Sequence, residues 1–319
     1  MSTAALRRNQ HAQPFRHEAL FYAGEAGFLG VTLPFIRDGV ARGEPILVVV
    51  SSRKIELLRA ALADDTDGVL FADMGEVGAN PARIIPAWRD FVEEHAEPGR
   101  RLRGIGEPVY AERSPAELIE CQRHEELLNL AFQDADDFWL VCPYDTDSLG
   151  PDILRDATLS HPFGGASGNG NENPEYRGLD AAVAPLADPL PEPGNEVHEL
   201  AFTGEGLGVV RGFVAEHAAS AGLGQTRAGE LVMAVNEAAT NSVRHGGGRG
   251  LLRVWREDSS IICEVRDAGS IDAPLAGRVR PRGAQAGGHG LWLVNQLCDL
   301  AQIRAAEDGG VVRLYMHAR

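Results

Sequence analysis

Two carboxylates and an amide share one edge of a predicted helix in this chain. Within the segment 230–245, Glu230, Glu237 and Asn241 fall within roughly 40° of one another at 100° per residue. A carboxylate beside a carboxamide can hold a water or hydroxyl together with a hard cation, because Mg²⁺ prefers oxygen ligands and keeps several waters. The competing interpretation is an ordinary solvated helix face, since charged faces are common.

Two later segments add chemistry of another kind. Asp267 ends an apolar strand pattern, and Gly269 follows it. A carboxylate at a strand end can accept a hydrogen bond from the amino group of adenine, and glycine lets a base approach the backbone. The run 286–294 contains Gly288 and Gly290 and opens a helix, so its backbone N–H groups can bind phosphate without lysine. Taken singly, these segments are also what a turn and a helix start look like.

Lysine usage excludes one common phosphate site. Lys54 is the only lysine among the 30 lysine and arginine residues of the 319-residue chain. A Walker A loop needs Gly-Lys-Ser/Thr, whereas Lys54 lies between Arg53 and Ile55. The chain therefore has no functional P-loop.

In this order, the three segments resemble the asparagine box and the two glycine boxes of the GHKL ATPase superfamily. They are most similar to the anti-sigma-factor serine kinases of the RsbW type, whose helix reads Glu-Leu-x-x-Ala-Val-x-Glu-Ala-x-Thr-Asn-x-x-x-His, as does 230–245 here. The resemblance covers nearly all of 196–319. It implies an α+β Bergerat (GHKL) ATPase sandwich that binds ATP and Mg²⁺.

The resemblance also implies roles for single residues. Glu237 would be the catalytic general base toward an acceptor hydroxyl, and Asn241 would bind Mg²⁺. Asp267 would bind the adenine amino group. The residues that would contact the nucleotide and its metal are Asn241, Asp267, Gly269, Gly288 and Gly290.

Three functions compete on this basis. The resemblance implies a switch protein that sequesters a sigma factor, phosphorylates a serine or threonine of a STAS-type anti-anti-sigma partner, and forms a homodimer through the second domain. The alternative is a nucleotide-dependent binding module without phosphoryl transfer, because Ile271 stands where the superfamily often has a second glycine and the stretch 271–287 is short for a lid. A soluble histidine kinase is a third, but no dimerising helix pair follows His124, which we expect on the surface.

The elements that would position these residues follow from periodicity and turn signals. We expect helices followed by hairpins, an α+β arrangement with the helices on one sheet face. The predicted strands are 197–203, 250–257, 260–267, 300–307 and 310–317, and the predicted helices are 206–221, 226–245 and 290–298.

The N-terminal part alternates strands and helices, which predicts an α/β domain with a parallel sheet and right-handed crossovers. The predicted strands are 19–23, 45–51, 68–73, 102–109 and 137–143. The predicted helices are 27–42, interrupted by Pro34, then 53–63, 81–96, 115–132 and 149–159.

Three segments, 17–22, 37–44 and 138–145, resemble the MEDS sensory domain, a RecA-like fold without its P-loop, over 15–163. That resemblance implies a domain that senses a small molecule or a protein. His17 and Cys142 lie near strand ends and could face one crevice as a ligand or redox site. The competing interpretation is a hydrogen-bonded histidine and a small buried thiol.

Composition limits the partners and the compartment. A net charge of −16 repels nucleic-acid phosphates and anionic lipids, so we expect no direct nucleic-acid or membrane binding. No apolar run approaches the ~20 residues that span a bilayer, and the N-terminus lacks a secretory signal pattern. The four cysteines form no C-x-x-C pair. We therefore expect a cytoplasmic protein with a disordered segment 1–14 and a Gly/Pro-rich linker at 164–195.

Overall fold

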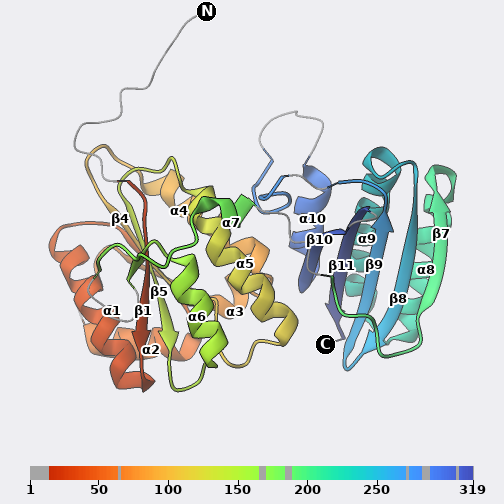
Figure 1. The fold of residues 1–319 in the computed structure, drawn as a ribbon. Coiled ribbons are helices and arrows are strands. Elements are labelled where there is room, and N and C mark those ends of the chain that lie inside the picture. Colours follow the sequence, from red (N-terminus) through yellow and green to blue (C-terminus); the bar gives the residue numbers. More distant parts are fainter. Residues whose placement is uncertain are drawn as a thin grey trace, which may run out of the picture. The chain divides into compact units, whose positions relative to one another are not determined.

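The computed structural model divides into two compact units, which are described separately (Figure 1). The first unit comprises Met1–Gly78 and Ala87–Ala182, and the second comprises Ala79–Pro86 and Val183–Arg319. The disorder expected for 1–14 concerns residues that, apart from Pro14, lie outside the described part. The described residues are 14–63, 66–164, 170–183, 189–270, 273–281, 288–306 and 309–318.

A six-stranded sheet with the order β3-β2-β4-β5-β1-β6 forms the centre of the first unit, and every pairing in it is parallel. Its strands are β1 Arg16–Tyr22, β2 Ile46–Val50, β3 Val69–Asp73, β4 Leu102–Gly106, β5 Phe138–Asp145 and β6 Phe163–Gly164. The helices in this part of the chain are α1 Gly24–Ala41, α2 Ser52–Leu62, α3 Met74–Val77, α4 Ile84–His95, α5 Pro115–Ala131, α6 Pro151–Ser160 and α7 Leu179–Val183. The 3₁₀ turn at Pro81–Arg83 and the start of α4, up to Pro86, belong to the second unit. The expected α/β class with a parallel sheet is confirmed.

Two local features of the first unit differ from the sequence prediction. Strand β1 begins at Arg16 and not at Ala19, because it pairs with β5 along its whole length and the buried Glu18 accepts hydrogen bonds from Arg16 and Trp139. Helix α1 runs through Pro34 without interruption. Buried apolar residues on both sides of the proline pack into the core, and this packing outweighs the missing N–H group.

The second unit contains a five-stranded antiparallel sheet with the order β10-β11-β9-β8-β7. Its strands are β7 His198–Thr203, β8 Arg249–Glu257, β9 Ser260–Asp267, β10 Leu300–Ala306 and β11 Gly309–His317. Its helices are α8 Leu207–Ser220, α9 Gln225–His245 and α10 His289–Leu297, preceded by a 3₁₀ turn at Gly204–Gly206. The expected α+β class is confirmed.

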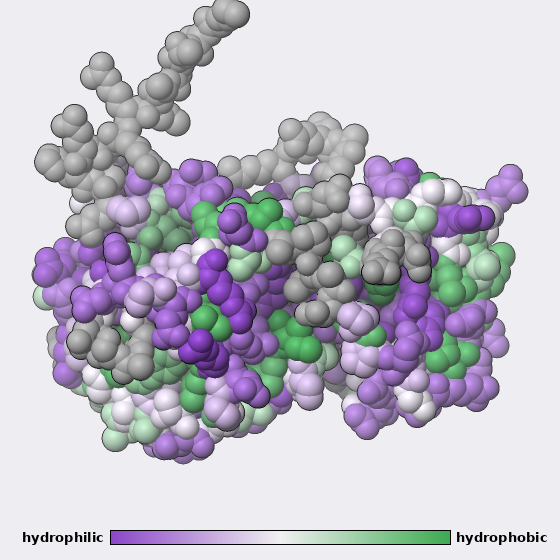
Figure 2. All heavy atoms as spheres, in the orientation of Figure 1, coloured by the Kyte–Doolittle hydropathy of each residue, from purple (hydrophilic) through white to green (hydrophobic). Residues whose placement is uncertain are grey.

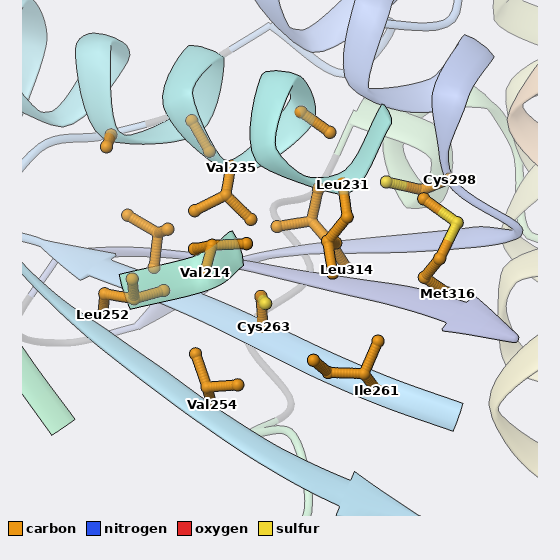
Figure 3. Packing of buried hydrophobic residues seen from close by; sticks show 14 of the residues in the cluster. Val214, Leu231, Val235, Leu252, Val254, Ile261, Cys263, Cys298, Leu314 and Met316 are labelled. Carbon is orange, nitrogen blue, oxygen red and sulfur yellow. The ribbon is translucent and has the colours of Figure 1, made fainter. Parts of the chain in front are cut away.

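The core of the second unit fixes how α9 lies on the sheet. Leu231 and Val235 are fully buried and point from α9 toward Cys263 and Leu314 of the strands (Figure 3). Burying side chains of this size stabilises the fold by about 1.5–3 kcal/mol each. The adjoining edge of the helix, which carries Glu237, is consequently held at the boundary between core and solvent.

The segment Ala79–Pro86 belongs to the second unit although its neighbours in sequence belong to the first. Arg83 donates hydrogen bonds of 2.8 Å to the backbone oxygens of Asn295, Gln296 and Cys298 at the end of α10. A guanidinium at this position satisfies carbonyl groups that have no partner within the helix and complements its dipole.

The described part of the linker predicted at 164–195 contacts both units separately. Residues 170–182 pack with the first unit, where Arg123 donates to backbone oxygens of α7. Farther along, Glu192 accepts a hydrogen bond of 2.8 Å from Arg253 in the second unit.

The surface is rich in hydrophilic residues, as expected for a chain with a net charge of −16. The face drawn in Figure 2 is mainly hydrophilic, with apolar residues scattered over it. Within the described ranges, no helix is both long enough and apolar enough to cross a membrane.

Candidate functional site

Helix α9 places Glu237 and Asn241 one turn apart on the same edge. Both side chains are partly buried, whereas Ala238 and Ala239 between them are buried against the rest of the unit. The side chain of Glu230, predicted to share this edge, forms an ion pair of 2.8 Å with Arg227. Within the described ranges, no hydrogen bond or ion pair engages the side chain of Glu237 or Asn241, so these two can meet a ligand.

The first turn of α10 lies against this pair. A Cβ atom added at Gly290 would lie 3.0 Å from Asn241 Nδ2 and 3.3 Å from Glu237 Oε2, so the absence of a side chain at Gly290 keeps this approach open. Gly288, the residue that precedes α10, has φ +86°, which favours glycine. The structure thus brings together two of the three predicted segments at the N-terminus of a helix, where free N–H groups and the helix dipole attract phosphate.

Asp267 is held at the C-terminal end of α9, where Ser242 directly follows Asn241. Its carboxylate accepts hydrogen bonds from Ser242 Oγ at 2.5 Å and from the backbone N–H of Gly269 at 2.8 Å. A Cβ atom at Gly246 would collide with the Asp267 side chain, and one at Gly269 would lie 2.8 Å from the His245 carbonyl oxygen. Each carboxylate oxygen keeps a free lone pair, so Asp267 can still accept a hydrogen bond from an amino group.

Sequence reasoning missed Ser242 and Gly246 in this arrangement. Ser242 is a small residue on the fully buried face of α9, and its hydroxyl donates the hydrogen bond that fixes Asp267. The three glycines directly after His245 were the available signal for a close approach. Ile271 and the run 282–287, on which the prediction of a short lid depends, lie outside the described residues.

The first unit has a cavity at the carboxyl ends of its parallel strands, the position where ligands bind in open α/β sheets. Its volume is about 640 Å³, and its lining includes Tyr22, Lys54, Glu107 and Asp145. Lys54 forms an ion pair of 2.6 Å with Glu107, which also accepts a 2.5 Å hydrogen bond from the Tyr22 hydroxyl. Burial raises the pKa of Glu107, although the charge of Lys54 opposes this shift. The only lysine is therefore engaged in the cavity wall.

His17 and Cys142 contact each other, with 3.3 Å between His17 Nε2 and Cys142 Sγ, but both are fully buried and neither lines the 640 Å³ cavity. Burial, with the charge of His161, lowers the pKa of His17 to about 4, and burial raises that of the Cys142 thiol well above its usual value. Glu125 and His161, which the sequence analysis did not single out, complete the cluster.

Comparison with known proteins assigns both units. Residues 16–162 match the family model described as MEDS, the "MEthanogen/methylotroph, DcmR Sensory domain". Residues 200–316 match the family model described as "Histidine kinase-like ATPase domain". The chain carries a MEDS domain followed by a histidine kinase-like ATPase domain. The resemblances to the MEDS domain and to the GHKL ATPase domain, both drawn from the sequence, are confirmed as domain families.

One similar solved structure is that of the RsbU and RsbW domains of Rv1364c from Mycobacterium tuberculosis. It is 19% identical in sequence with a TM-score of 0.29, and the match covers 38% of this chain and 32% of that chain. The present chain thus spans about a third of the length of that relative. No curated protein gives a significant match.

The histidine kinase-like ATPase domain implies ATP binding, and its residues fit that ligand. Gly290 brings the start of α10 against Glu237 and Asn241, and Asp267 keeps acceptor capacity at the C-terminal end of α9.

In the MEDS domain, His124 is 1% exposed, so the expectation of a surface histidine is wrong. The face of α5 that carries His124 packs against the rest of the domain, and the polar residues around His124 gave no apolar periodicity that would predict this burial.

Proposed function

We propose that this protein is an anti-sigma regulator that binds ATP with Mg²⁺, sequesters a sigma factor and phosphorylates a serine or threonine of a STAS-type partner. The observation that carries the proposal is the meeting of Glu237, Asn241 and the start of α10 at Gly290. These are the segments whose order and spacing resemble the RsbW-type kinases.

Each residue of the site has a role in this proposal. Asp267 accepts a hydrogen bond from the adenine amino group, and the N–H groups around Gly288 and Gly290 bind phosphate oxygens. Asn241 offers its amide oxygen to Mg²⁺, a cation that takes oxygen ligands and supplies charge neutralisation at the phosphates. Glu237 takes the proton of the acceptor hydroxyl. The hydroxyl oxygen forms its bond to the γ-phosphorus as the bond from that phosphorus to the ADP oxygen breaks.

The MEDS domain supplies the input in this proposal. A small molecule enters the cavity lined by Tyr22, Lys54 and Glu107 and biases the activity of the ATPase domain. The partly buried ion pair in the cavity wall favours a polar ligand that can hydrogen-bond to Glu107 or Lys54. An apolar ligand that separated the two charges would leave Glu107 buried without a partner, which is costly. By family resemblance, we further propose that the protein acts as a homodimer through its ATPase domain and works in the cytoplasm.

The test is transfer of label from γ-labelled ATP to candidate STAS proteins by the full chain. We expect label on the STAS protein that survives acid, as serine or threonine phosphate does and histidine phosphate does not. Loss of the label in acid would contradict the assignment to serine or threonine. ATP-dependent capture of a sigma factor or a STAS protein without any label transfer would support the binding-module alternative and refute the kinase.

A further inference from the structure

Four side chains from four elements of the MEDS domain converge in a closed cluster. His17 lies on β1, Glu125 on α5 and Cys142 on β5, and His161 directly follows α6. All four are at most 1% exposed, and one potential ligand atom of each lies within 4.8 Å of the other three. Glu125 Oε2 is 3.0 Å from His17 Nε2 and 3.2 Å from His161 Nε2. Ligands of a tetrahedral ion with bonds of about 2.0–2.1 Å lie about 3.3 Å apart, so the two separations from Glu125 are close to those around one central ion.

Hydrogen bonds behind the cluster fix which nitrogen of His17 carries its proton. The amide nitrogen of Asn129 donates to the Ser160 backbone oxygen at 2.8 Å, and this orients the Asn129 oxygen toward His17 Nδ1 at 3.1 Å. An amide oxygen only accepts, so Nδ1 is the donor. Nε2 of the neutral ring therefore presents its lone pair to the cluster.

His161 is oriented in the same way. Its Nδ1 lies 2.7 Å from the Ala157 backbone oxygen, which can only accept, so Nδ1 carries the proton and Nε2 again presents a lone pair. Backbone and amide oxygens that hold the outer nitrogen of an imidazole are the usual supports of histidines that bind metals.

The cluster consequently holds more acceptors than donors. Two imidazole lone pairs and the Glu125 carboxylate face one another. With the His161 proton on Nδ1, the 3.2 Å approach of its Nε2 to Glu125 Oε2 is not a hydrogen bond, and within the described residues Glu125 Oε1 has no partner either. A buried polar atom without a partner costs about 1–3 kcal/mol, more when it is charged. The thiol proton of Cys142 can satisfy only one of these acceptors. A cation at the centre would satisfy all of them.

We propose that His17, Glu125, Cys142 and His161 form a closed four-ligand metal site that holds Zn²⁺. Two imidazoles, a thiolate and a carboxylate are ligands that zinc accepts in tetrahedral sites. Binding releases the Cys142 thiol proton to solvent, and the two anionic ligands then balance the charge of the dication within a buried environment. With all four ligands from the protein and no exposed position, the ion joins two strands to two helices and stabilises the MEDS domain.

The site is tested on the full chain, purified without a metal-affinity step. Elemental analysis should find about one zinc per chain, and the Cys142→Ser variant should lose most of it. The matched control is Cys121→Ser, which alters another fully buried cysteine of the same domain outside the cluster. It should keep its zinc.

Replacement of zinc by Co²⁺ reports on the ligands even where a variant is less stable. The parent should show the ligand-field bands of tetrahedral cobalt and a thiolate charge-transfer band, and Cys142→Ser should lose the latter. Removal of the metal by a chelator should lower the melting temperature, and added Zn²⁺ should restore it. A folded parent chain that contains no zinc and takes up neither Zn²⁺ nor Co²⁺ would overturn the proposal, as would equal metal loss in both cysteine variants.

Discussion

At the scale of single residues, the candidate nucleotide site depends on glycines, whose lack of a side chain lets the elements approach closely, as much as on its polar side chains. Gly290 allows α10 to approach Glu237 and Asn241, and Gly246 allows β9 to place Asp267 against the end of α9. Sequence patterns identified Glu237, Asn241 and Asp267 because carboxylates and amides at this spacing can bind a cation, a proton or an amino group. They did not identify Ser242, because a small residue on a buried stripe looks the same whether it fills space or donates a hydrogen bond.

The Gly290→Ala substitution should weaken ATP binding by about tenfold or more, which corresponds to about 1.4 kcal/mol. The added Cβ would lie 3.0 Å from Asn241 Nδ2, so the amide must shift from its place beside the phosphate-binding turn. Calorimetric titration of the full chain with ATP measures the change. Gly212→Ala on α8, whose Cβ meets nothing within 4 Å, is the control and should bind ATP like the parent. Equal affinities for both variants would contradict the placement of the phosphates.

The Asp267→Asn substitution should also weaken ATP binding, because it removes a charge-assisted hydrogen bond in a partly buried site. Such a loss costs about 1.5–3 kcal/mol, or roughly ten- to a hundred-fold in Kd. The same titration applies, with Asp258→Asn in the exposed β8–β9 turn as the control. An unchanged Kd for Asp267→Asn would remove this residue from the adenine site.

The buried cluster of the MEDS domain contains one residue, Glu125, that the sequence alone could not connect with His17. His17 and Cys142 drew attention as types that bind ligands, and the structure brings them into contact. Glu125 lies within the run Arg123-His124-Glu125-Glu126, which looks like a solvated charged face. Only the tertiary packing of α5 turns Glu125 inward, so no local pattern could have joined it to His17.

At the scale of elements, hydrophobic periodicity and turn residues predicted nearly all helices and strands. The hairpin of β8 and β9 turns at Asp258-Ser259, and that of β10 and β11 turns around Gly309, as the sequence indicates. The start of β1 was missed because Arg16, His17 and Glu18 are polar. Strand pairing and specific polar partners bury them, and neither is encoded in an apolar pattern.

The sheet of the ATPase domain contains a buried ion-pair cluster that should matter for its stability. Glu264 on β9 is fully buried and accepts hydrogen bonds from Arg253, Arg266 and Arg313 at 2.5–2.9 Å. Glu264→Gln leaves buried guanidinium charge uncompensated, which costs about 3–5 kcal/mol. Hydrogen exchange in β8 and β9 should rise accordingly. The exposed Glu257→Gln is the control, and matched exchange rates in the two variants would contradict this account.

The same cluster gives a pH dependence. Burial would raise the pKa of Glu264, but the hydrogen bond from Arg266 and the charge of Arg313 outweigh it and lower the pKa below its usual value. A lowered pKa in the folded state stabilises the fold above the unfolded-state value, about 4.3, and this contribution is lost as the pH falls through the folded-state pKa. Protection of β9 in the parent should therefore fall in acid more than it does in Glu264→Gln.

At the scale of the whole molecule, the chain joins a domain of a sensory family to a domain of an ATPase family. The order of domains, the absence of a P-loop and the acidic charge could be derived from the sequence alone. The sequence could not predict that Ala79–Pro86 packs as part of the second unit, because the segment continues into α4 without a change in composition. Its Arg83 finds the carbonyl groups of α10 only in the folded structure.

The central claim is phosphoryl transfer with Glu237 as the base, and its most direct test is the rate at which a STAS partner gains phosphate. The parent chain, Glu237→Gln and the exposed control Glu216→Gln are each incubated with ATP, Mg²⁺ and the partner. We expect Glu237→Gln to bind ATP like the parent and to transfer phosphate about 10²–10⁴-fold more slowly, while Glu216→Gln transfers at the parent rate. Transfer by Glu237→Gln at the parent rate, or no transfer by the parent to any STAS protein, would contradict the account.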